Sequence, residues 1–405
     1  MSDDTEREAF ERAILENPDD AAGYAAYADW LQERGDPRGE FIAVQLALED
    51  ASRARVERDT LKQRENDLLK ANEWDWLGEL GAHLLRKDDN QPKIQHWWAR
   101  GFLTELRVQY PTTSLVETLA SARAARLLRK LHIETFAPDL ARQLRAPMRP
   151  DTPSLPGTEQ QEAEFTSVAE NAFENLRILQ VGEEGEPSSN GWTDCNVYAV
   201  GLEQLVARLP RVEELYLLCN GYDARFLFGL PNLTRLQVLR VYGFGEEGIS
   251  ELSNVPLQAL ARNPALGALT HLSIHPHYSR DYSFLPLDEV RALVYSPHLG
   301  SLSNLQLRLS DMGDEGARAI VESGLLLRIG WLDLRNGTIS DFGAKAFADC
   351  AAAKNLRRLD LSRNRLTPAG LNMLRRAGVN AVADNALSRR ESEARERDER
   401  DEEME

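Results

Sequence analysis

The chain has 405 residues, with 48 Lys and Arg against 65 Asp and Glu, which gives a formal net charge of −17. At about 150 residues per domain, this length predicts two or three domains with a sizeable core. The negative charge argues against a general nucleic-acid-binding surface, because most of the field around the protein would repel phosphate, although a local basic patch stays compatible with it. Hydrophobic residues make up 42% and charged residues 28% of the chain, a composition typical of a globular protein.

The first 72 residues are predicted to form a helical module. Apolar residues recur at helical spacing around Phe10 and Ile14 and again from Tyr24 to Leu31. Turn sequences at 17–20 and 35–39 separate these segments. The pattern therefore predicts three helices, the third running from Glu40 to about Leu69.

Three segments of this module carry a resemblance to a known family. They are YADWL (27–31), GDPRGEF (35–41) and FIAVQ (41–45). Over about residues 5–48 the module closely resembles the repeat-companion domain of bacterial leucine-rich-repeat proteins, best known from planctomycetes and myxobacteria. WWARGF (97–102) is similar to the junction that enters the first repeat in these proteins, so residues 73–100 are assigned to a junction. The resemblance implies repeats further along the chain and no assigned activity.

Polar residues of the module have two interpretations. In the structural one, Trp30 packs on the third helix, while Asp36 and Arg38 pair with each other and cap neighbouring helix ends. In the functional one, Trp30, Arg34, Asp36 and Arg38 form a docking surface. The sequence leaves both open.

Internal repetition dominates the rest of the chain. Residues 356–366 fit the pattern LxxLxLxxNxL, and the preceding unit begins 27 residues earlier at Ile329. The core L-x-x-L-x-L pattern has nine candidates, the first two fainter than the others. They begin at Leu103, Leu128, Leu176, Val212, Leu236, Leu269, Leu302, Ile329 and Leu356. A proline-rich stretch at about 137–170 is predicted to be an insertion, and residues 388–405 a charged disordered or frayed-helix tail.

One such repeat cannot bury its own apolar face, whereas a stack of repeats makes a continuous core. We therefore expect an α/β fold: a leucine-rich-repeat solenoid over 101–387 with a parallel inner sheet and outer helices, preceded by the small all-α module. The helical halves of the repeats resemble the longer ribonuclease-inhibitor type. A globular α/β sheet of unrelated strands is the alternative.

The inner face of the solenoid is the predicted working surface. Side chains alternate along a strand, so the third, fifth and seventh residues of each repeat are expected to be exposed there. Aromatic and Arg side chains dominate interface energetics, and they are frequent in this set. The residues proposed to contact a partner on this concave face are Tyr216, Arg240, Tyr242, His271, His275, Arg308, Trp331, Asp333 and Arg335.

Motifs for other chemistry are weak. GFGEEG (243–248) fits GxGxxG, but its two glutamates would face the phosphate. His271 and His275 would lie about 13 Å apart along a strand, at roughly 3.3 Å per residue, so they cannot share an ion, and only His275, His277 and Asp281 stay conceivable as metal ligands. We predict no catalytic residue, metal or cofactor.

The function that these observations favour is a non-catalytic scaffold that binds a partner protein. A regulator or inhibitor of an enzyme, of the ribonuclease-inhibitor or GTPase-regulating kind, is an alternative by fold analogy. A hydrolase has no motif behind it. The sequence has no long apolar stretch and an acidic beginning, from which we expect a cytoplasmic protein that binds neither membrane nor nucleic acid.

Overall fold

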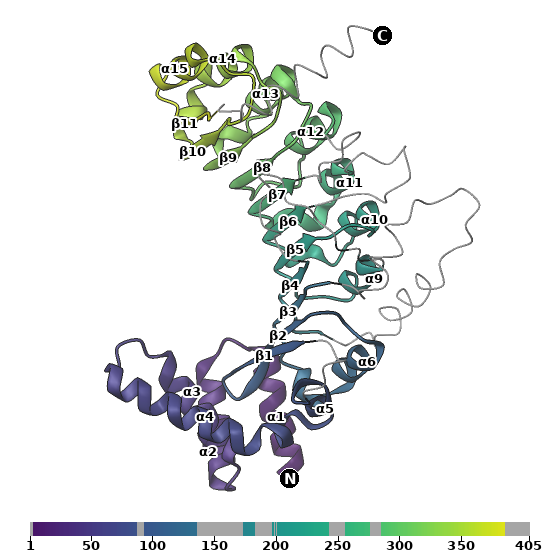
Figure 1. The fold of residues 1–405 in the computed structure, drawn as a ribbon, viewed down its shortest axis with the longest axis vertical. Helices are drawn as coiled ribbons and strands as arrows, with labels where there is room; N and C mark the ends of the chain where they lie inside the picture. The colour runs from purple at the N-terminus through teal and green to yellow at the C-terminus, as the bar shows by residue number, and fades with distance from the viewer. Residues whose placement is uncertain are drawn as a thin grey trace, which may run out of the picture. The chain divides into compact units, whose positions relative to one another are not determined.

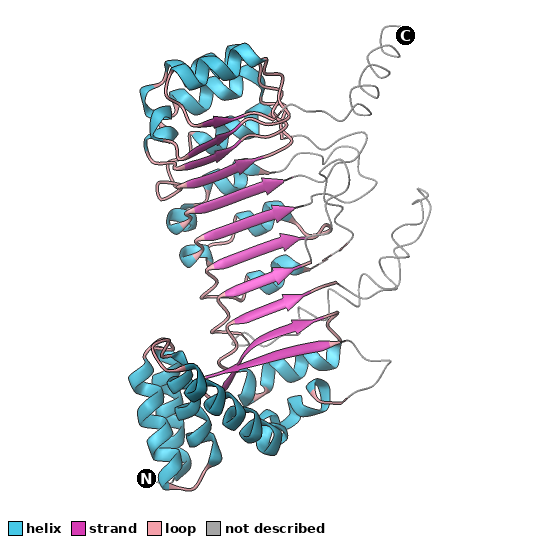
Figure 2. Ribbon diagram, turned by 60° about the vertical axis from the view of Figure 1, so that its left-hand side comes forward, coloured by secondary structure: helices cyan, strands magenta, loops and turns pink. Residues whose placement is uncertain are grey.

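The computed structural model describes residues 3–86, 93–135, 173–182, 197, 199, 201–242, 256–275 and 285–384. By its contacts the chain divides into two compact units. The first comprises Met1–Glu183 and Asn196–Tyr216, and the second comprises Glu184–Cys195 and Leu217–Glu405. Within the described ranges, the sheet takes its strands in chain order from β1 to β11 (Figure 2).

The first unit opens with the helical module. It contains α1 (Asp3–Glu16), α2 (Ala21–Glu33) and α3 (Pro37–Glu49), and α4 (Arg55–Leu77) extends five residues past the predicted end of the module at residue 72. The 3₁₀ turn η1 (Gly78–Leu80) and α5 (Gly81–Leu84) follow in the predicted junction. Both predicted turns contain an N-cap: Asp20 accepts a hydrogen bond from the Ala22 N–H (3.0 Å), and Asp36 accepts one from the Arg38 N–H (2.9 Å). Helix α3 therefore begins at Pro37, three residues before the predicted start at Glu40.

The prediction of a single third helix is wrong, because this segment forms two helices. Helix α3 ends at Glu49, and α4 begins at Arg55. Between them the Asp50 carboxylate accepts hydrogen bonds from both the N–H (2.9 Å) and the hydroxyl (2.6 Å) of Ser52. An Asx-turn of this kind offers the backbone an alternative to the helix, so it interrupts an apolar pattern that would otherwise continue.

A β-hairpin follows the module. Strand β1 (Ile94–Ala99) pairs antiparallel with β2 (Phe102–Val108). Arg100 and Gly101 make the two-residue turn with φ of 49° and 83°. Positive φ at both central positions suits the twist of the flanking strands. The WWARGF motif is therefore the hairpin that starts the sheet.

Gln45 of α3 binds this hairpin turn. Its amide oxygen accepts a hydrogen bond from the Gly101 N–H (2.7 Å), and its amide nitrogen donates to the Trp98 carbonyl (3.2 Å). Next to it, Arg100 forms a bidentate ion pair with Glu49 at 2.7 and 2.8 Å. The resemblance segments at 41–45 and 97–102 thus contact each other.

The α1–α2 turn binds the segments that enter the next two strands, β3 (Lys130–Ile133) and β4 (Ile178–Val181). Asp19 lies 3.1 Å from the Arg129 guanidinium and 2.9 Å from that of Arg177. The module is therefore held to three successive strands of the first unit. This unit also contains α6 (Thr113–Ser121), η2 (Arg123–Ala125), α9 (Leu202–Val206) and most of β5 (Glu214–Leu218).

The second unit repeats strand and helix. Its elements are α10 (Ala224–Phe228), η3 (Leu233–Arg235), β6 (Val238–Tyr242), α11 (Leu257–Arg262), η4 (Pro264–Ala268), β7 (His271–His275), α12 (Leu287–Val294), β8 (Asn304–Leu307), α13 (Gly313–Glu322), η5 (Leu325–Leu327), β9 (Trp331–Asp333), α14 (Asp341–Asp349), η6 (Ala351–Asn355), β10 (Arg358–Asp360), α15 (Pro368–Arg376) and β11 (Ala381–Val382). The helices lie along one side of strands β6–β11 (Figure 1).

Each of the nine predicted L-x-x-L-x-L segments carries a strand, including the two fainter ones. In the second unit the central leucines pair in register from Leu239 through Leu272, Leu305 and Leu332 to Leu359. All five are buried, as are Leu106, Leu131 and Leu179 of the first unit. The shared register places the leucines in one continuous row, which confirms the expected repeat fold.

Polar side chains connect the last repeats to one another. The Asn364 amide donates to the Leu334 carbonyl (2.8 Å), and its oxygen accepts from Gly337 and Ile339 N–H groups (2.9 Å each). Asp314 accepts from the N–H and hydroxyl of Ser340 in the next repeat (2.8 and 2.6 Å). Asp341 binds Thr367 in the same way (2.9 and 2.5 Å). These bonds satisfy backbone groups where one repeat meets the next and fix the spacing between repeats.

Candidate functional site

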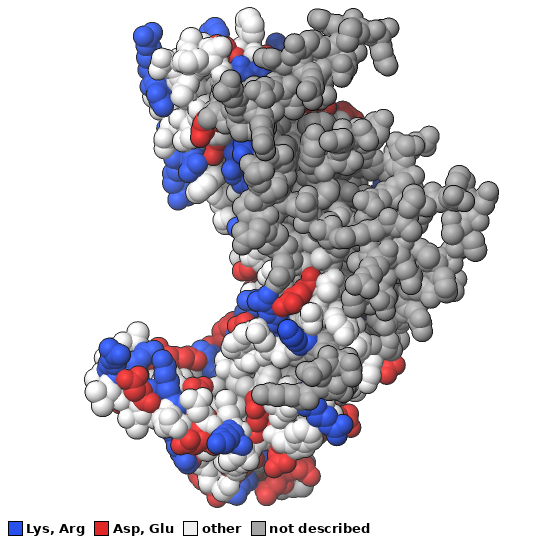
Figure 3. All heavy atoms as spheres, viewed as in Figure 1, with Lys and Arg blue, Asp and Glu red and all other residues white. Residues whose placement is uncertain are grey.

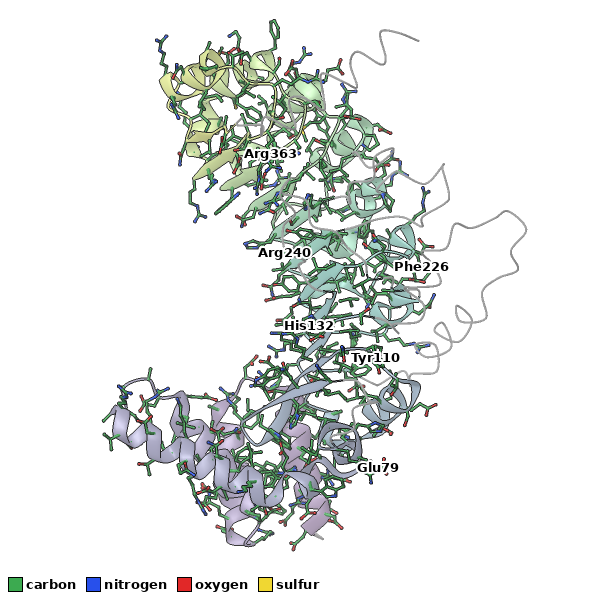
Figure 4. All side chains as sticks on the ribbon, viewed as in Figure 1. Glu79, Tyr110, His132, Phe226, Arg240 and Arg363 are labelled. Atoms are coloured by element: carbon green, nitrogen blue, oxygen red, sulfur yellow. The ribbon has the colours of Figure 1, made fainter. Side chains whose placement is uncertain are left out.

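The sheet of the second unit has one face away from its helices. We call this the open face and define it by the third, fifth and seventh residues of the five repeats that contain β6–β10. The fifteen positions are Val238, Arg240, Tyr242, His271, Ser273, His275, Asn304, Gln306, Arg308, Trp331, Asp333, Arg335, Arg358, Asp360 and Ser362. Figure 4 labels Arg240, whose side chain extends from β6 on this side.

A buried carboxylate lies at the centre of the C-terminal half of this face. Asp333 is only 1% exposed. Arg308 from the neighbouring strand donates to its Oδ2 through Nε at 2.9 Å, with a second nitrogen at 2.8 Å. Arg335 donates to both oxygens, through Nε to Oδ1 at 3.0 Å and through Nη2 to Oδ2 at 2.7 Å. The carboxylate thus holds two guanidinium groups in fixed positions.

Asp360 repeats this arrangement one strand further. It is also buried, and Arg358 donates to its Oδ2 at 2.9 Å. The same guanidinium lies over the indole of Trp331, with 5.5 Å from its Cζ to the ring centroid. Cation–π geometry of this kind keeps both side chains ordered on the surface. Trp331 stays 42% exposed, so its ring is available to a partner.

The expectation that all of these positions are exposed is wrong for two of the predicted site residues. Asp333 is covered by its two arginines, as described. His275 is 7% exposed and packs edge-on against Tyr242, with ring centroids 5.1 Å apart. Both side chains point to the open face, yet side chains of adjacent positions close over them.

The remaining predicted residues of this face are exposed or half-buried. Arg240 and His271 are exposed, and Tyr242, Arg308 and Arg335 are half-buried. The His271 ring contacts the Thr270 hydroxyl at 2.8 Å and the Asn304 amide at 2.7 Å. Tyr216 belongs to the first unit, where it is half-buried and donates its hydroxyl proton to Glu214 at 2.6 Å.

The N-terminal docking candidates are occupied within the module. Trp30 donates its indole N–H to Glu6 (3.0 Å), and Arg34 lies over the Trp30 ring at 4.0 Å while it binds the same Glu6 (3.1 Å). Asp36 pairs with Arg7 as well as capping α3. Arg38 donates to the Trp76 carbonyl (3.3 Å) instead of pairing with Asp36. The capping expected of Asp36 is confirmed, and its partners differ from those expected.

Arg358 and Asp360 were not among the predicted site residues. Their signal was present in the sequence, because Asp follows the central leucine in two consecutive repeats and an Arg stands two residues before or after it. An Asp that recurs at the same open-face position of consecutive repeats indicates that these repeats share one arrangement of side chains. Considering each residue separately does not reveal this recurrence.

The pKa of Asp333 gives this cluster a pH dependence. Burial raises the pKa to about 6, against the opposing charge of Arg308 and with a further rise from Asp360. Arg335 and Arg358 also face the carboxyl. Because the native pKa lies above the usual value of 3.8, the native state takes up this proton more readily than the unfolded chain, and the contribution to stability grows as the pH falls.

We therefore expect the free energy of unfolding of the wild type to rise by about 1 kcal/mol relative to that of an Asp333→Asn variant when the pH falls from about 7 to 5. The measurement is urea unfolding of both proteins at the two pH values. Asp349→Asn, at an exposed carboxylate of α14 paired with Lys345, is the control. A difference between wild type and Asp333→Asn that stays constant with pH would contradict the raised pKa.

Comparison with known proteins agrees with this architecture. The family described as leucine rich repeat matches residues 301–321, which contain β8 and most of α13, and 352–374, which contain β10 and most of α15. These units are leucine-rich repeats. Proteins with leucine-rich repeats generally mediate protein–protein interaction. No curated protein matches the chain.

Two of the solved structures that are similar to this chain are a Bacteroides fragilis protein and a leucine-rich-repeat protein of Leptospira interrogans. The first is 14% identical, covers 67% of this chain and 69% of its own, and has a TM-score of 0.43. The second is 10% identical, covers 68% and 93%, and has a TM-score of 0.20.

Other candidates lie outside the described residues: GFGEEG (243–248), His277 and Asp281, the insertion at 137–170 and the tail at 388–405. In the part of the chain that the structure describes, no three His, Cys, Asp or Glu side chains come together as metal ligands would. None of the described helices combines the length and apolarity needed to cross a lipid bilayer.

Proposed function

We propose that this protein is a non-catalytic scaffold that binds a partner protein on the open face of its repeats. The observation that carries the proposal is the group formed by Trp331, Arg358, Arg335 and Arg308 over two buried aspartates. Trp and Arg are the residues most enriched at interface hot spots. The other contact residues proposed on the open face are Arg240, Tyr242 and His271. Tyr216, on a strand of the first unit, is proposed as a contact residue separately.

Preorganisation supports this role. An Arg side chain that orders only on binding loses rotamer freedom, at about 0.5–1.5 kcal/mol for each immobilised side chain. Here the hydrogen bonds to Asp333 and Asp360 hold three guanidinium groups before a partner arrives. Asp333 and His275 are then positioning residues below the surface, since both are buried.

We infer that the N-terminal module is a repeat-companion domain of the bacterial type and caps the stack. A terminal repeat needs a polar cover to stay soluble. The contacts of Gln45 with the hairpin and of Asp19 with Arg129 and Arg177 support this role. The boundaries proposed for the module, junction and solenoid are 1–72, 73–100 and 101–387, and the expected compartment is the cytoplasm.

A photo-crosslinking experiment tests which face binds. p-Benzoylphenylalanine replaces Trp331 in one variant and Phe342 in a matched control. Phe342 is an 81% exposed aromatic residue on α14, on the helical side of the same repeat. In cells that express the protein, we expect position 331 to crosslink to a distinct protein and position 342 not to do so. Equal crosslinking at both positions would refute binding on the open face.

Once that protein is purified, Trp331→Ala should weaken its binding by about 2 kcal/mol, or about thirtyfold, if Trp331 is a hot spot. The loss of stability should stay below about 1 kcal/mol, since Trp331 is 42% exposed and the substitution removes its cation–π contact with Arg358. Phe342→Ala serves as the control expected to keep full affinity. A Trp331→Ala variant that loses several kcal/mol of stability with unchanged binding would make Trp331 a core residue.

A further inference from the structure

The open face has a charge opposite in sign to that of the chain. Its fifteen positions hold four arginines, Arg240, Arg308, Arg335 and Arg358, against the two aspartates Asp333 and Asp360, a net charge of +2. The whole chain carries −17. In Figure 3 blue side chains gather where Figure 1 labels β9 and β10.

The depth of the charges strengthens this contrast. Both aspartates are buried, whereas the side chains of Arg308, Arg335 and Arg358 are 21%, 36% and 43% exposed. A guanidinium has five N–H donors in a planar fork. Arg308 and Arg335 each direct two nitrogens to Asp333, which leaves one terminal nitrogen of each guanidinium outside these bonds. The face that a partner meets is therefore cationic.

Strands of the first unit do not share this property. There the corresponding positions pair their charges side by side, Arg107 with Glu134 and Lys130 with Glu105. Such pairs leave little net field. The positive charge is thus a feature of β6–β10 and does not follow from leucine-rich repeats as such.

We propose that the segment bound by the open face is an acidic protein segment, rich in Asp and Glu, with an apolar side chain placed against Trp331. This inference rests on the proposed function and adds the chemistry of the partner. A partner carboxylate can accept a charge-assisted hydrogen bond from each of the remaining terminal nitrogens, and complementary charge speeds encounter. Nucleic acid is disfavoured because its long charged backbone would extend beyond the open face along a chain that carries −17, whereas a short acidic segment can stay on the face.

The experiment uses the full chain and a short fluorescein-labelled peptide in which Glu alternates with Ser around one central Phe. Two matched peptides carry Gln or Lys in place of Glu. By fluorescence anisotropy at low salt, we expect the Glu peptide to bind at least about tenfold more tightly than either other peptide. Raising the salt concentration from about 50 to 300 mM should weaken binding of the Glu peptide about tenfold, because the higher salt concentration screens exposed charges from one another beyond a few ångströms.

Protein variants place the binding on the open face. Arg240→Glu and the milder Arg358→Gln should each weaken the Glu peptide several-fold. Arg318→Glu and Arg318→Gln make the same changes at an exposed position of α13 on the helical side, and we expect both to bind like wild type. Circular dichroism of each variant shows whether it is folded. If a Glu variant does not fold, Arg358→Gln and Arg318→Gln still give a matched comparison.

Three outcomes would overturn the proposal. The first is that the Gln peptide binds as well as the Glu peptide. The second is that the Arg318 variants weaken binding as much as the open-face variants. The third is that a single-stranded oligonucleotide binds more tightly than the peptide and loses affinity in the open-face variants. In each case crosslinking at Trp331 tests the proposed function separately.

Discussion

Replacing Leu332 with Asp is expected to unfold the repeats on both sides of β9. Leu332 is fully buried and lies in register between Leu305 of β8 and Leu359 of β10. An unpaired carboxylate there would lie inside the shared core, which costs several kcal/mol, so we expect a loss above about 4 kcal/mol. Urea unfolding gives the loss, and hydrogen exchange read by mass spectrometry shows which strands lose protection.

Trp331→Asp is the matched control, because it adds the same carboxylate one residue earlier on the exposed side of the strand. We expect it to leave exchange in β8 and β10 near the wild-type level. Leu359→Asp should repeat the effect of Leu332→Asp one repeat further. Loss of protection confined to β9 in the Leu332→Asp variant would show that each repeat is stable by itself, against the nearest-neighbour stabilisation expected of a solenoid.

The strands could be predicted from sequence because one physical requirement sets them. Leucines at the first, fourth and sixth positions must enter the core in every repeat, so even the fainter copies at Leu103 and Leu128 kept the spacing and form β2 and β3. The helices between them vary in length, from five residues in α10 to ten in α13, and the spacing does not dictate their bounds.

Burial on the open face could not be predicted in the same way. Alternation along a strand gives the direction of a side chain but says nothing of what covers it. Asp333 is buried because Arg308 reaches over from β8 and Arg335 folds back from two residues on. His275 is buried against Tyr242 of the adjacent repeat. In both cases the covering group comes from another position, and its conformation decides the exposure.

Two further features are visible in the sequence as polar residues, although the spacing of apolar residues does not predict them. The helix break after Glu49 depends on the turn chemistry of Asp50 and Ser52, which competes with an uninterrupted apolar pattern. The bonds of Asp314 and Asp341 to the next repeat recur with an interval of 27 residues in the sequence. A Gly follows two residues after each Asp, at Gly316 and Gly343, so a repeat comparison of polar and glycine positions would have found this connection.

Replacing Gly101 with Ala should weaken the packing of the N-terminal module against the first strands. Gly101 has a φ of 83°, which costs an L-residue about 1 kcal/mol, and an added Cβ would lie 2.2 Å from Cγ1 of Ile42. Ile42 is fully buried in the core of the module, so it has little room to move. We expect a total loss of about 3 kcal/mol in urea unfolding, together with faster exchange of the Gly101 N–H that donates to Gln45.

Gly35→Ala controls for the backbone, because Gly35 also has a positive φ, 69°, with nothing within 4 Å of an added Cβ. Gly35→Ala should lower the free energy of unfolding by only about 1 kcal/mol. A double-mutant cycle isolates the contact itself: Ile42→Ala removes Cγ1, so Gly101→Ala should cost about 1 kcal/mol in that background instead of 3. Strict additivity of the two substitutions would mean that Ile42 of α3 does not pack against the hairpin turn, and the proposed cap would lose this contact with the sheet.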